Sequence, residues 1–217
     1  MRRSIPETFL YMALLPYYYG DTTMNKRDVD VVRYLLDDRS AGCSVSSISK
    51  GLRLDYKTAH GIVSRLKRDG FVSLEDFGGS WKVSLVRECR PLVFEAECLR
   101  RDSALKDKDL SAAVGYFKRG LGQSPYVMLL FGSYAKGTQS KHSDIDLLFI
   151  VPDNTEGPYE KSIARIARSI PLDIHVNVFS VRDFIAMKDS KQASVGSEVI
   201  KSNIILHGIE DYYGMIG

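Results

Sequence analysis

The sequence predicts an α+β protein with two domains: a helical N-terminal domain that ends in a β-hairpin, and an α/β domain built on a mixed sheet. Three observations predict this class. Apolar residues recur at helical spacing early in the chain, two alternating runs flank a Gly-Gly turn, and later apolar runs have the length of buried strands. The 217 residues suffice for two small domains, each with its own core.

The composition is that of an ordinary globular protein, with 44% hydrophobic and 26% charged residues. The net charge is only +3, so the total charge indicates no particular partner. Cys43, Cys89 and Cys98 are scattered, which favours reduced thiols in a cytoplasmic protein over a disulfide framework or a zinc site. No run approaches the roughly 20 apolar residues that span a bilayer, so no membrane association is expected.

Apolar periodicity places three helices near the N-terminus. The first is expected to start at Lys26. A second, short helix is expected after an N-cap at Ser44 or Ser46. The third is expected over residues 56–69, with Asp55 as its N-cap.

The two alternating runs, residues 71–74 and 81–86, surround the glycine turn and predict a β-hairpin. Three helices followed by a hairpin resemble a winged helix-turn-helix. The resemblance covers residues 26–87 and is clearest over residues 58–72, which are similar to the recognition helix and the start of the wing. It implies a third helix that enters the major groove of double-stranded DNA.

Positive charge is concentrated around the expected third helix. From Lys50 to Asp69 there are six basic and two acidic residues, a local charge of +4. By the resemblance, side chains off the apolar face and in the wing would contact DNA. These residues are Lys57, Ser64, Arg65, Arg68 and Lys82. The alternative is a winged helix that serves only dimerisation or partner docking.

The second domain is expected to begin with a strand over residues 127–131, whose continuous apolar run suits burial on both faces. A polar loop over residues 134–143 leads to a second strand over 144–151, and a third strand is expected over 172–179. Helices are expected over residues 91–122, 162–170, 181–188 and 195–202.

The residues most typical of a chemical site lie around the first two of these strands. Asp144 and Asp146 are two apart on a strand, so both point to the same face. Two such carboxylates repel each other unless a cation lies between them, and Mg²⁺ prefers oxygen ligands. Gly132 and Ser133 directly follow the preceding strand, where a missing Cβ would let a phosphate approach the backbone.

The Gly-Ser pair, the spacer and the Asp-x-Asp pair resemble the signature of the DNA polymerase β-like nucleotidyltransferases. Ser143, before the first aspartate, makes the minimal nucleotidyltransferases the most similar branch. The resemblance covers residues 107–217, and residues 204–208 are similar to the family's C-terminal segment. It implies a third carboxylate on a later strand, where Asp173 has the matching place.

The resemblance implies metal-dependent transfer of a nucleoside monophosphate, expected to be AMP, from an NTP to an acceptor hydroxyl. Two Mg²⁺ ions, or Mn²⁺ in their place, would be held by Asp144, Asp146 and Asp173. The residues expected at the nucleotide phosphates are Gly132, Ser133, Lys136 and Ser143. Many relatives carry Arg at the position of Tyr134, and Lys136 is expected to supply that charge.

His175 and Asn177 share the face of Asp173 by strand alternation. A structural role for His175 is at least as well supported by the sequence as a role in the site.

Two classes of acceptor are open. Minimal nucleotidyltransferases often act as antitoxins that modify a partner toxin, so the resemblance implies a toxin-like protein acceptor, and a small-molecule alcohol is the other class. The alternative function is a transcription regulator whose nucleotidyltransferase fold senses a nucleotide or a partner. A homodimer is expected in that case, because winged-helix regulators commonly read paired half-sites.

The expected domain organisation has four parts. Residues 1–24 form an N-terminal arm, 25–90 the winged-helix domain, 91–106 a helical connector and 107–217 the nucleotidyltransferase domain.

Overall fold

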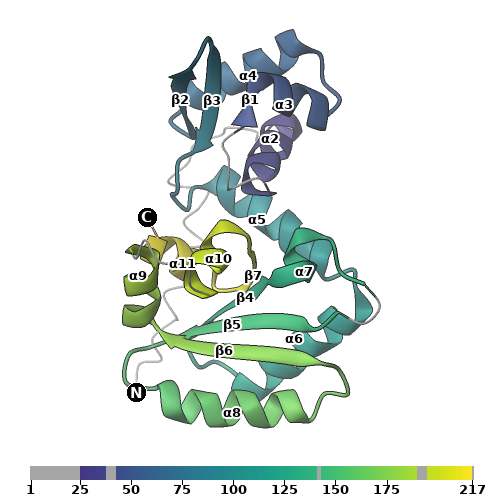
Figure 1. The fold of residues 1–217 in the computed structure, drawn as a ribbon, viewed down its shortest axis with the longest axis vertical. Coiled ribbons are helices and arrows are strands. Elements are labelled where there is room, and N and C mark those ends of the chain that lie inside the picture. Colours follow the sequence, from purple (N-terminus) through teal and green to yellow (C-terminus); the bar gives the residue numbers. More distant parts are fainter. Residues whose placement is uncertain (1–24, 38–42, 141–142, 190–194, 217) are drawn as a thin grey trace, which may run out of the picture.

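The computed structural model describes residues 25–37, 43–140, 143–189 and 195–216, and the expected N-terminal arm lies outside these ranges. Figure 1 shows the described chain as an upper and a lower part, with helix α5 (Pro91–Ala104) between them. The upper part holds a three-stranded sheet and the lower part a mixed four-stranded sheet. The predicted α+β class is confirmed.

The upper part has the winged-helix arrangement that the sequence predicts. Three helices come first, and the hairpin that follows them pairs with a two-residue strand, giving the sheet order β1-β3-β2. This short strand was not expected, since two residues are too few to show an alternating pattern. The elements are α2 (Lys26–Asp37), β1 (Cys43–Ser44), α3 (Val45–Gly51), α4 (Tyr56–Arg68), β2 (Val72–Phe77) and β3 (Ser80–Leu85).

Side-chain caps begin two of these helices at expected residues. Ser44 Oγ accepts a hydrogen bond from the N–H of Ser47 at 3.0 Å, and Asp55 Oδ1 accepts one from the N–H of Thr58 at 2.9 Å. Each cap satisfies an N–H group that has no partner inside its helix. Gly70 follows α4 with a φ of +75°, a left-handed conformation that glycine adopts without steric cost.

The lower part is a sheet of order β6-β5-β4-β7, in which β4 is antiparallel to β5 and β7, and β5 is parallel to β6. All five residues of β4 are buried, as its continuous apolar run predicts. The strands are β4 (Val127–Phe131), β5 (Ile145–Val151), β6 (Ile174–Ser180) and β7 (Ile204–His207). The helices are α6 (Lys108–Leu121), α7 (Gly132–Lys136), α8 (Glu156–Arg168), α9 (Val181–Asp189), α10 (Val195–Lys201) and α11 (Ile209–Ile216).

Successive residues of β5 enter two different cores. Leu147 and Phe149 pack with α6 and α8, and Phe117 of α6 lies 5.1 Å from Phe149 between ring centroids. Leu148 and Ile150 face the opposite way, toward α9, α11 and the core that continues into the winged helix. Because side chains alternate along a strand, Asp146 shares the face of Leu148, on the same side as α10 and α11 (Figure 1).

Several details differ from the sequence-based expectation. Residues 91–122 form two helices, α5 and α6, and strand β7 was not expected. The stretch expected as a polar loop over residues 134–143 begins inside the short helix α7, because Gly132 turns the chain directly after β4 and Gly137, at φ +67°, ends the helix. Helix α8 starts at Glu156, six residues before the expected start. A final helix, α11, follows β7 and was not expected.

A buried charged network joins the two parts of the molecule. Arg100 of α5 is only 4% exposed, and its guanidinium donates to Asp37 Oδ1 at 2.7 Å, Glu97 Oε2 at 2.7 Å and the carbonyl of Asn203 at 2.9 Å. The hydroxyl of Tyr213 donates to the other oxygen of Glu97 at 2.9 Å. One arginine therefore holds α2 of the winged helix and the chain entering β7 against the same helix.

Among the described helices, none combines the length and the apolar character needed to cross a membrane.

Candidate active site

Strand pairing brings the three predicted carboxylates together at one end of the lower sheet, where β5 and β6 begin. Asp144 directly precedes β5, and Asp146 pairs with Phe131 of β4 on one side and with His175 of β6 on the other. The N–H of Ile145 donates to the carbonyl of Asp173 at 2.9 Å, which sets Asp173 beside Asp144. Paired residues on neighbouring strands share a face, so the three aspartates and His175 project from the same side of the sheet.

His175 lies nearest to the two carboxylates of β5. Its Nδ1 is 3.6 Å from Asp144 Oδ2 and 3.5 Å from Asp146 Oδ1. The three side chains remain accessible, with exposed fractions of 66% for His175, 43% for Asp144 and 27% for Asp146. Strand alternation in the sequence indicated that His175 shares this face, but not that it contacts both acids.

Gly132 provides the space in which the Asp146 carboxylate lies. Its φ is +68°, and a Cβ built on it would collide with Asp146 Oδ2. Any other residue at this position would displace the carboxylate or the backbone. The chain therefore needs glycine here for two separate reasons, its conformation and its neighbour.

The remaining residues predicted to bind phosphate lie in and after α7. Gly132 and Ser133 are its first two residues, where backbone N–H groups have no acceptor within the helix. The Lys136 ammonium lies 3.0 Å from Glu198 Oε1 on α10, so this predicted phosphate ligand is engaged in an exposed ion pair. Ser143 Oγ accepts a hydrogen bond from the N–H of Ser140 at 2.8 Å and thereby orders the turn before Asp144.

The donor set suits a divalent cation. Two carboxylates project from one face, and their mutual repulsion is relieved by a cation between them. Within the described ranges, no three His, Cys, Asp or Glu side chains already surround a common metal position. Carboxylates that repel each other favour such a gap, and the side chains of Asp144 and His175 are accessible to solvent.

A hollow of about 990 Å³ borders α7. Its walls come from α7, from α10, from the corner between α5 and α6, and from Arg33 and Asp37 of the winged helix. Lys136 lies on its wall, four residues after Gly132, which is about 6 Å along a helix. The hollow thus borders the helix that begins at Gly132, none of the three aspartates lines it, and its volume is in the range of small-molecule sites.

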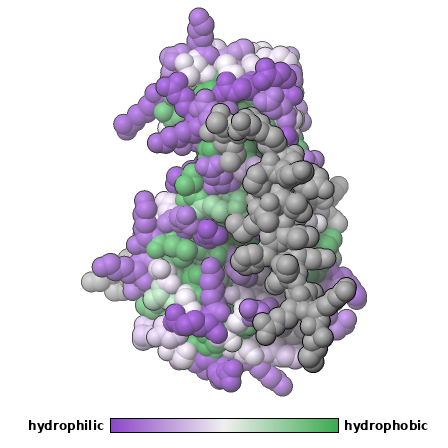
Figure 2. Space-filling view, turned by 180° about the vertical axis from the view of Figure 1, so that it is seen from behind, coloured by the Kyte–Doolittle hydropathy of each residue, from purple (hydrophilic) through white to green (hydrophobic). Residues whose placement is uncertain are grey.

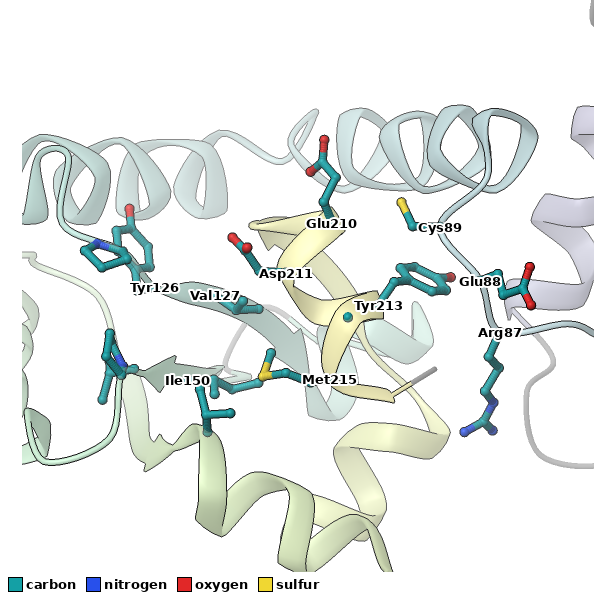
Figure 3. A pocket seen from close by; sticks show the side chains of 15 residues that line it. Arg87, Glu88, Cys89, Tyr126, Val127, Ile150, Glu210, Asp211, Tyr213 and Met215 are labelled. Atoms are coloured by element: carbon teal, nitrogen blue, oxygen red, sulfur yellow. The ribbon is translucent and has the colours of Figure 1, made fainter. Parts of the chain in front are cut away.

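A second cavity, of about 780 Å³, lies elsewhere (Figure 3). Val127 and Ile150 line it, at the end of β4 and β5 remote from Asp146, and α11 contributes Tyr213 and Met215. The cavity is therefore separate from the carboxylates. Cys89 also lines it, and burial raises the pKa of this thiol to about 12, so it is not a thiolate nucleophile at neutral pH.

The residues predicted to contact DNA divide into two groups. Lys57 and Ser64 are exposed on α4, and Arg68 is exposed beside Asp69, which it contacts at 3.0 Å. Arg65 instead forms a two-pronged hydrogen-bonded ion pair with Asp28 of α2. The pair ties α4 to α2, so Arg65 contributes to packing inside the domain.

Lys82 is half-buried in the wing, paired across the strands with Glu75. In the view from behind, hydrophilic residues cover most of the upper end of the molecule, where the winged helix lies (Figure 2).

Residues 114–204 match the family model described as nucleotidyltransferase domain, and this segment contains the Gly-Ser corner and all three aspartates. The lower part of the molecule thus carries a nucleotidyltransferase domain, joined to a winged helix. No curated protein matches the chain.

The structure is also similar to solved structures, at low TM-scores. MepR, a transcription regulator of the Staphylococcus aureus multidrug efflux pump MepA, matches with 12% identity and a TM-score of 0.34, over 54% of this chain and 99% of that chain. Bordetella bronchiseptica BpsR matches with 17% identity and a TM-score of 0.33, over 58% of this chain and 98% of that chain. A toxin-antitoxin with AMP-PNP matches with 21% identity and a TM-score of 0.33, over 47% of this chain and 78% of that chain. Similarity at this level assigns no function to the chain.

Proposed function

We propose that the protein is a metal-dependent nucleotidyltransferase. It transfers a nucleoside monophosphate, expected to be AMP, from an NTP to a hydroxyl group of a protein or small-molecule acceptor. The observation that carries the proposal is the Asp146 carboxylate, seated against Gly132 at the corner between β4 and α7. This contact places the aspartates of β5 next to the first residues of α7. All of these residues lie within the segment that matches the nucleotidyltransferase model.

Each residue of the candidate active site has a distinct role in this proposal. Asp144, Asp146 and Asp173 would hold divalent ions, which neutralise the charge that develops on the transferring phosphate. Ser133 and the first N–H groups of α7 would donate hydrogen bonds to phosphate oxygens. The acceptor hydroxyl attacks the α-phosphorus, pyrophosphate leaves, and Asp173 accepts the hydroxyl proton.

The acceptor is expected to enter along the hollow beside α7. This hollow is bordered by the proposed phosphate-binding helix on one side and by Arg33 and Asp37 of the winged helix on the other. Charged side chains, among them Arg33, Asp37 and Lys136, line part of it, which suits a polar acceptor such as a surface segment of a protein or an amino alcohol.

The test is transfer of label from α-³²P-labelled ATP, with Mg²⁺ or Mn²⁺, to proteins and small molecules of a cell lysate. We expect Asp144→Asn and Asp146→Asn to lower transfer by at least about a hundredfold, because the charge stabilisation is lost. Glu160→Gln removes an exposed carboxylate on α8 and should transfer label like the parent. Equal transfer by the parent and both aspartate variants would refute the proposal.

A second function, binding of double-stranded DNA, is favoured by the exposed basic side chains of α4. Lys57 and Arg68 lie on its outward face, as a helix that enters the major groove requires. DNA binding is compatible with transfer and also with a regulator whose second domain senses a nucleotide. Salt-sensitive DNA binding without any label transfer would favour the regulator.

A further inference from the structure

The position of His175 has a consequence for the proposed metal site. It is the residue of β6 that pairs directly with Asp146, and its ring presents Nδ1 to both carboxylates of β5. The nitrogen is almost equidistant from one oxygen of each acid, at 3.6 and 3.5 Å. An imidazole nitrogen thus faces one oxygen of each carboxylate, although among the described residues these three groups do not surround a common metal position.

These separations are close to those of atoms that share a metal ion. With metal–ligand bonds of about 2.1 Å at right angles, neighbouring ligand atoms lie about 3.0 Å apart. The measured 3.5 and 3.6 Å exceed this value by only about half an ångström. Since His175 is 66% exposed, a small side-chain rotation closes the difference without disturbing the core.

We propose that His175 is a nitrogen ligand of the divalent ion held by Asp144 and Asp146. The inference rests on the proposed function and extends it to the choice of metal. Mg²⁺ is a hard ion that favours all-oxygen ligands, whereas imidazole suits first-row transition metals. A site with two carboxylates and one imidazole prefers an ion such as Mn²⁺ over Mg²⁺.

The packing around His175 supports a ligand role over a role in the fold. A histidine that stabilises a core is itself buried, as His207 is in part, where it stacks on Tyr126 at 4.5 Å between ring centroids. His175 has most of its surface in solvent and directs one nitrogen at two acids from a neighbouring strand. Its replacement should therefore change metal binding and leave folding intact.

The decisive experiment is pulsed electron paramagnetic resonance of Mn²⁺ bound to the full-length protein without nucleotide. Direct coordination by imidazole gives ¹⁴N modulation, which changes to the ¹⁵N pattern when histidine is ¹⁵N-labelled. We expect this modulation in the parent, its loss in His175→Asn, and its retention in His60→Asn, which alters an exposed histidine on α4.

Affinity provides a second readout that needs no catalysis. Titration of free Mn²⁺, followed by competition with Mg²⁺, gives the preference for one ion over the other. Replacing a ligand should weaken Mn²⁺ binding at least as much as loss of an outer-shell partner does, about 10- to 100-fold, and Mg²⁺ binding far less. The selectivity for Mn²⁺ should therefore collapse in His175→Asn.

The outcomes separate this inference from the proposed function. Mn²⁺ that binds in the parent, is lost in Asp146→Asn and shows no ¹⁴N modulation would overturn the role of His175 and leave the carboxylate site standing. Mn²⁺ binding that is equal in the parent and in Asp146→Asn would overturn both.

Discussion

Gly132 is the residue that most constrains the candidate site. Its positive φ and the adjacent Asp146 oxygen both exclude a side chain, whereas Gly137 has a similar φ of +67° and nothing within 4 Å of the position that a Cβ would take. The two glycines therefore separate the effect of backbone conformation from the effect of contact with the carboxylate. They form a matched pair for mutation.

We predict that Gly132→Ala and Gly137→Ala each destabilise the protein by about 1–2 kcal/mol, the usual cost of a left-handed non-glycine residue. Only Gly132→Ala should also abolish Mn²⁺ binding and label transfer, since its methyl group displaces the Asp146 carboxylate. Thermal unfolding and metal titration measure the two effects. Normal metal affinity in Gly132→Ala would contradict the proposed role of Gly132 in making space for the Asp146 carboxylate.

We predict that His207 makes the stability of the protein depend on pH. Burial lowers its pKa from the ordinary value of 6.5, and Lys118 adds to the shift. Between the lowered pKa and 6.5 the unfolded chain binds a proton that the folded chain does not, so stability is full above 6.5 and falls as the pH drops through this window.

Urea unfolding at pH 7.5 and at pH 5.0 tests this prediction. His207→Asn should lose part of the pH dependence that the parent shows, because the group that titrates on unfolding is gone. An unchanged difference between the two pH values would exclude His207 as its source.

At the scale of elements, helix α4 has one buried apolar face and one exposed basic face. Its apolar face, with Ile62 and Leu66, is buried in the winged-helix core, and Arg65 at the edge is held by Asp28. Lys57 and Arg68 remain on the outer face. A basic residue close to the proposed DNA-binding face can therefore stabilise the fold instead, and the structure distinguishes the two by the partner of its side chain.

The difference is measurable in DNA binding. Lys57→Ala should weaken binding to all sequences alike and lower the slope of log K against log salt by about 1, as loss of one phosphate contact does. Arg65→Ala should leave that slope unchanged and lower the midpoint of thermal unfolding. A fall in slope with Arg65→Ala and none with Lys57→Ala would reverse this assignment.

At the scale of the whole molecule, the two parts are joined by a buried charge cluster rather than by a flexible connector. Arg100 and Glu97 both lie on α5 and are almost wholly buried, and their partners come from α2, from the chain before β7 and from α11. Removing one member leaves a buried charge without its counter-charge. The orientation of the winged helix relative to the candidate site therefore depends on this cluster.

We predict that Arg100→Met lowers the free energy of unfolding by about 3–5 kcal/mol, the usual cost of breaking a buried ion pair. The double variant, Arg100→Met with Glu97→Met, should lose less free energy of unfolding than the sum of the losses in the two single variants. The reason is that it leaves no unpaired charge at this position. Arg101→Met removes a surface pair with Asp102 and should cost less than about 1 kcal/mol. Chemical denaturation of the parent and these four variants provides the comparison.

Local patterns carried much of the prediction. Helix spacing, the caps at Ser44 and Asp55 and the glycine turn of the hairpin involve residues within a few positions of one another, so their physical cause is present in the sequence. The common face of Asp144 and Asp146 follows from alternation along one strand. Helix α7 was missed because the polar residues after Gly132 resemble a loop as much as one short turn of helix.

The sequence by itself determined the two-part α+β architecture and the elements that carry the acids. Only the tertiary structure decided which distant side chains meet: His175 with the acids of β5, Lys136 with Glu198, and Arg100 with Asp37. The physical reason is that these contacts depend on strand register and on the packing of helices against each other. Both are set by the burial of the whole core, which no short stretch of sequence contains.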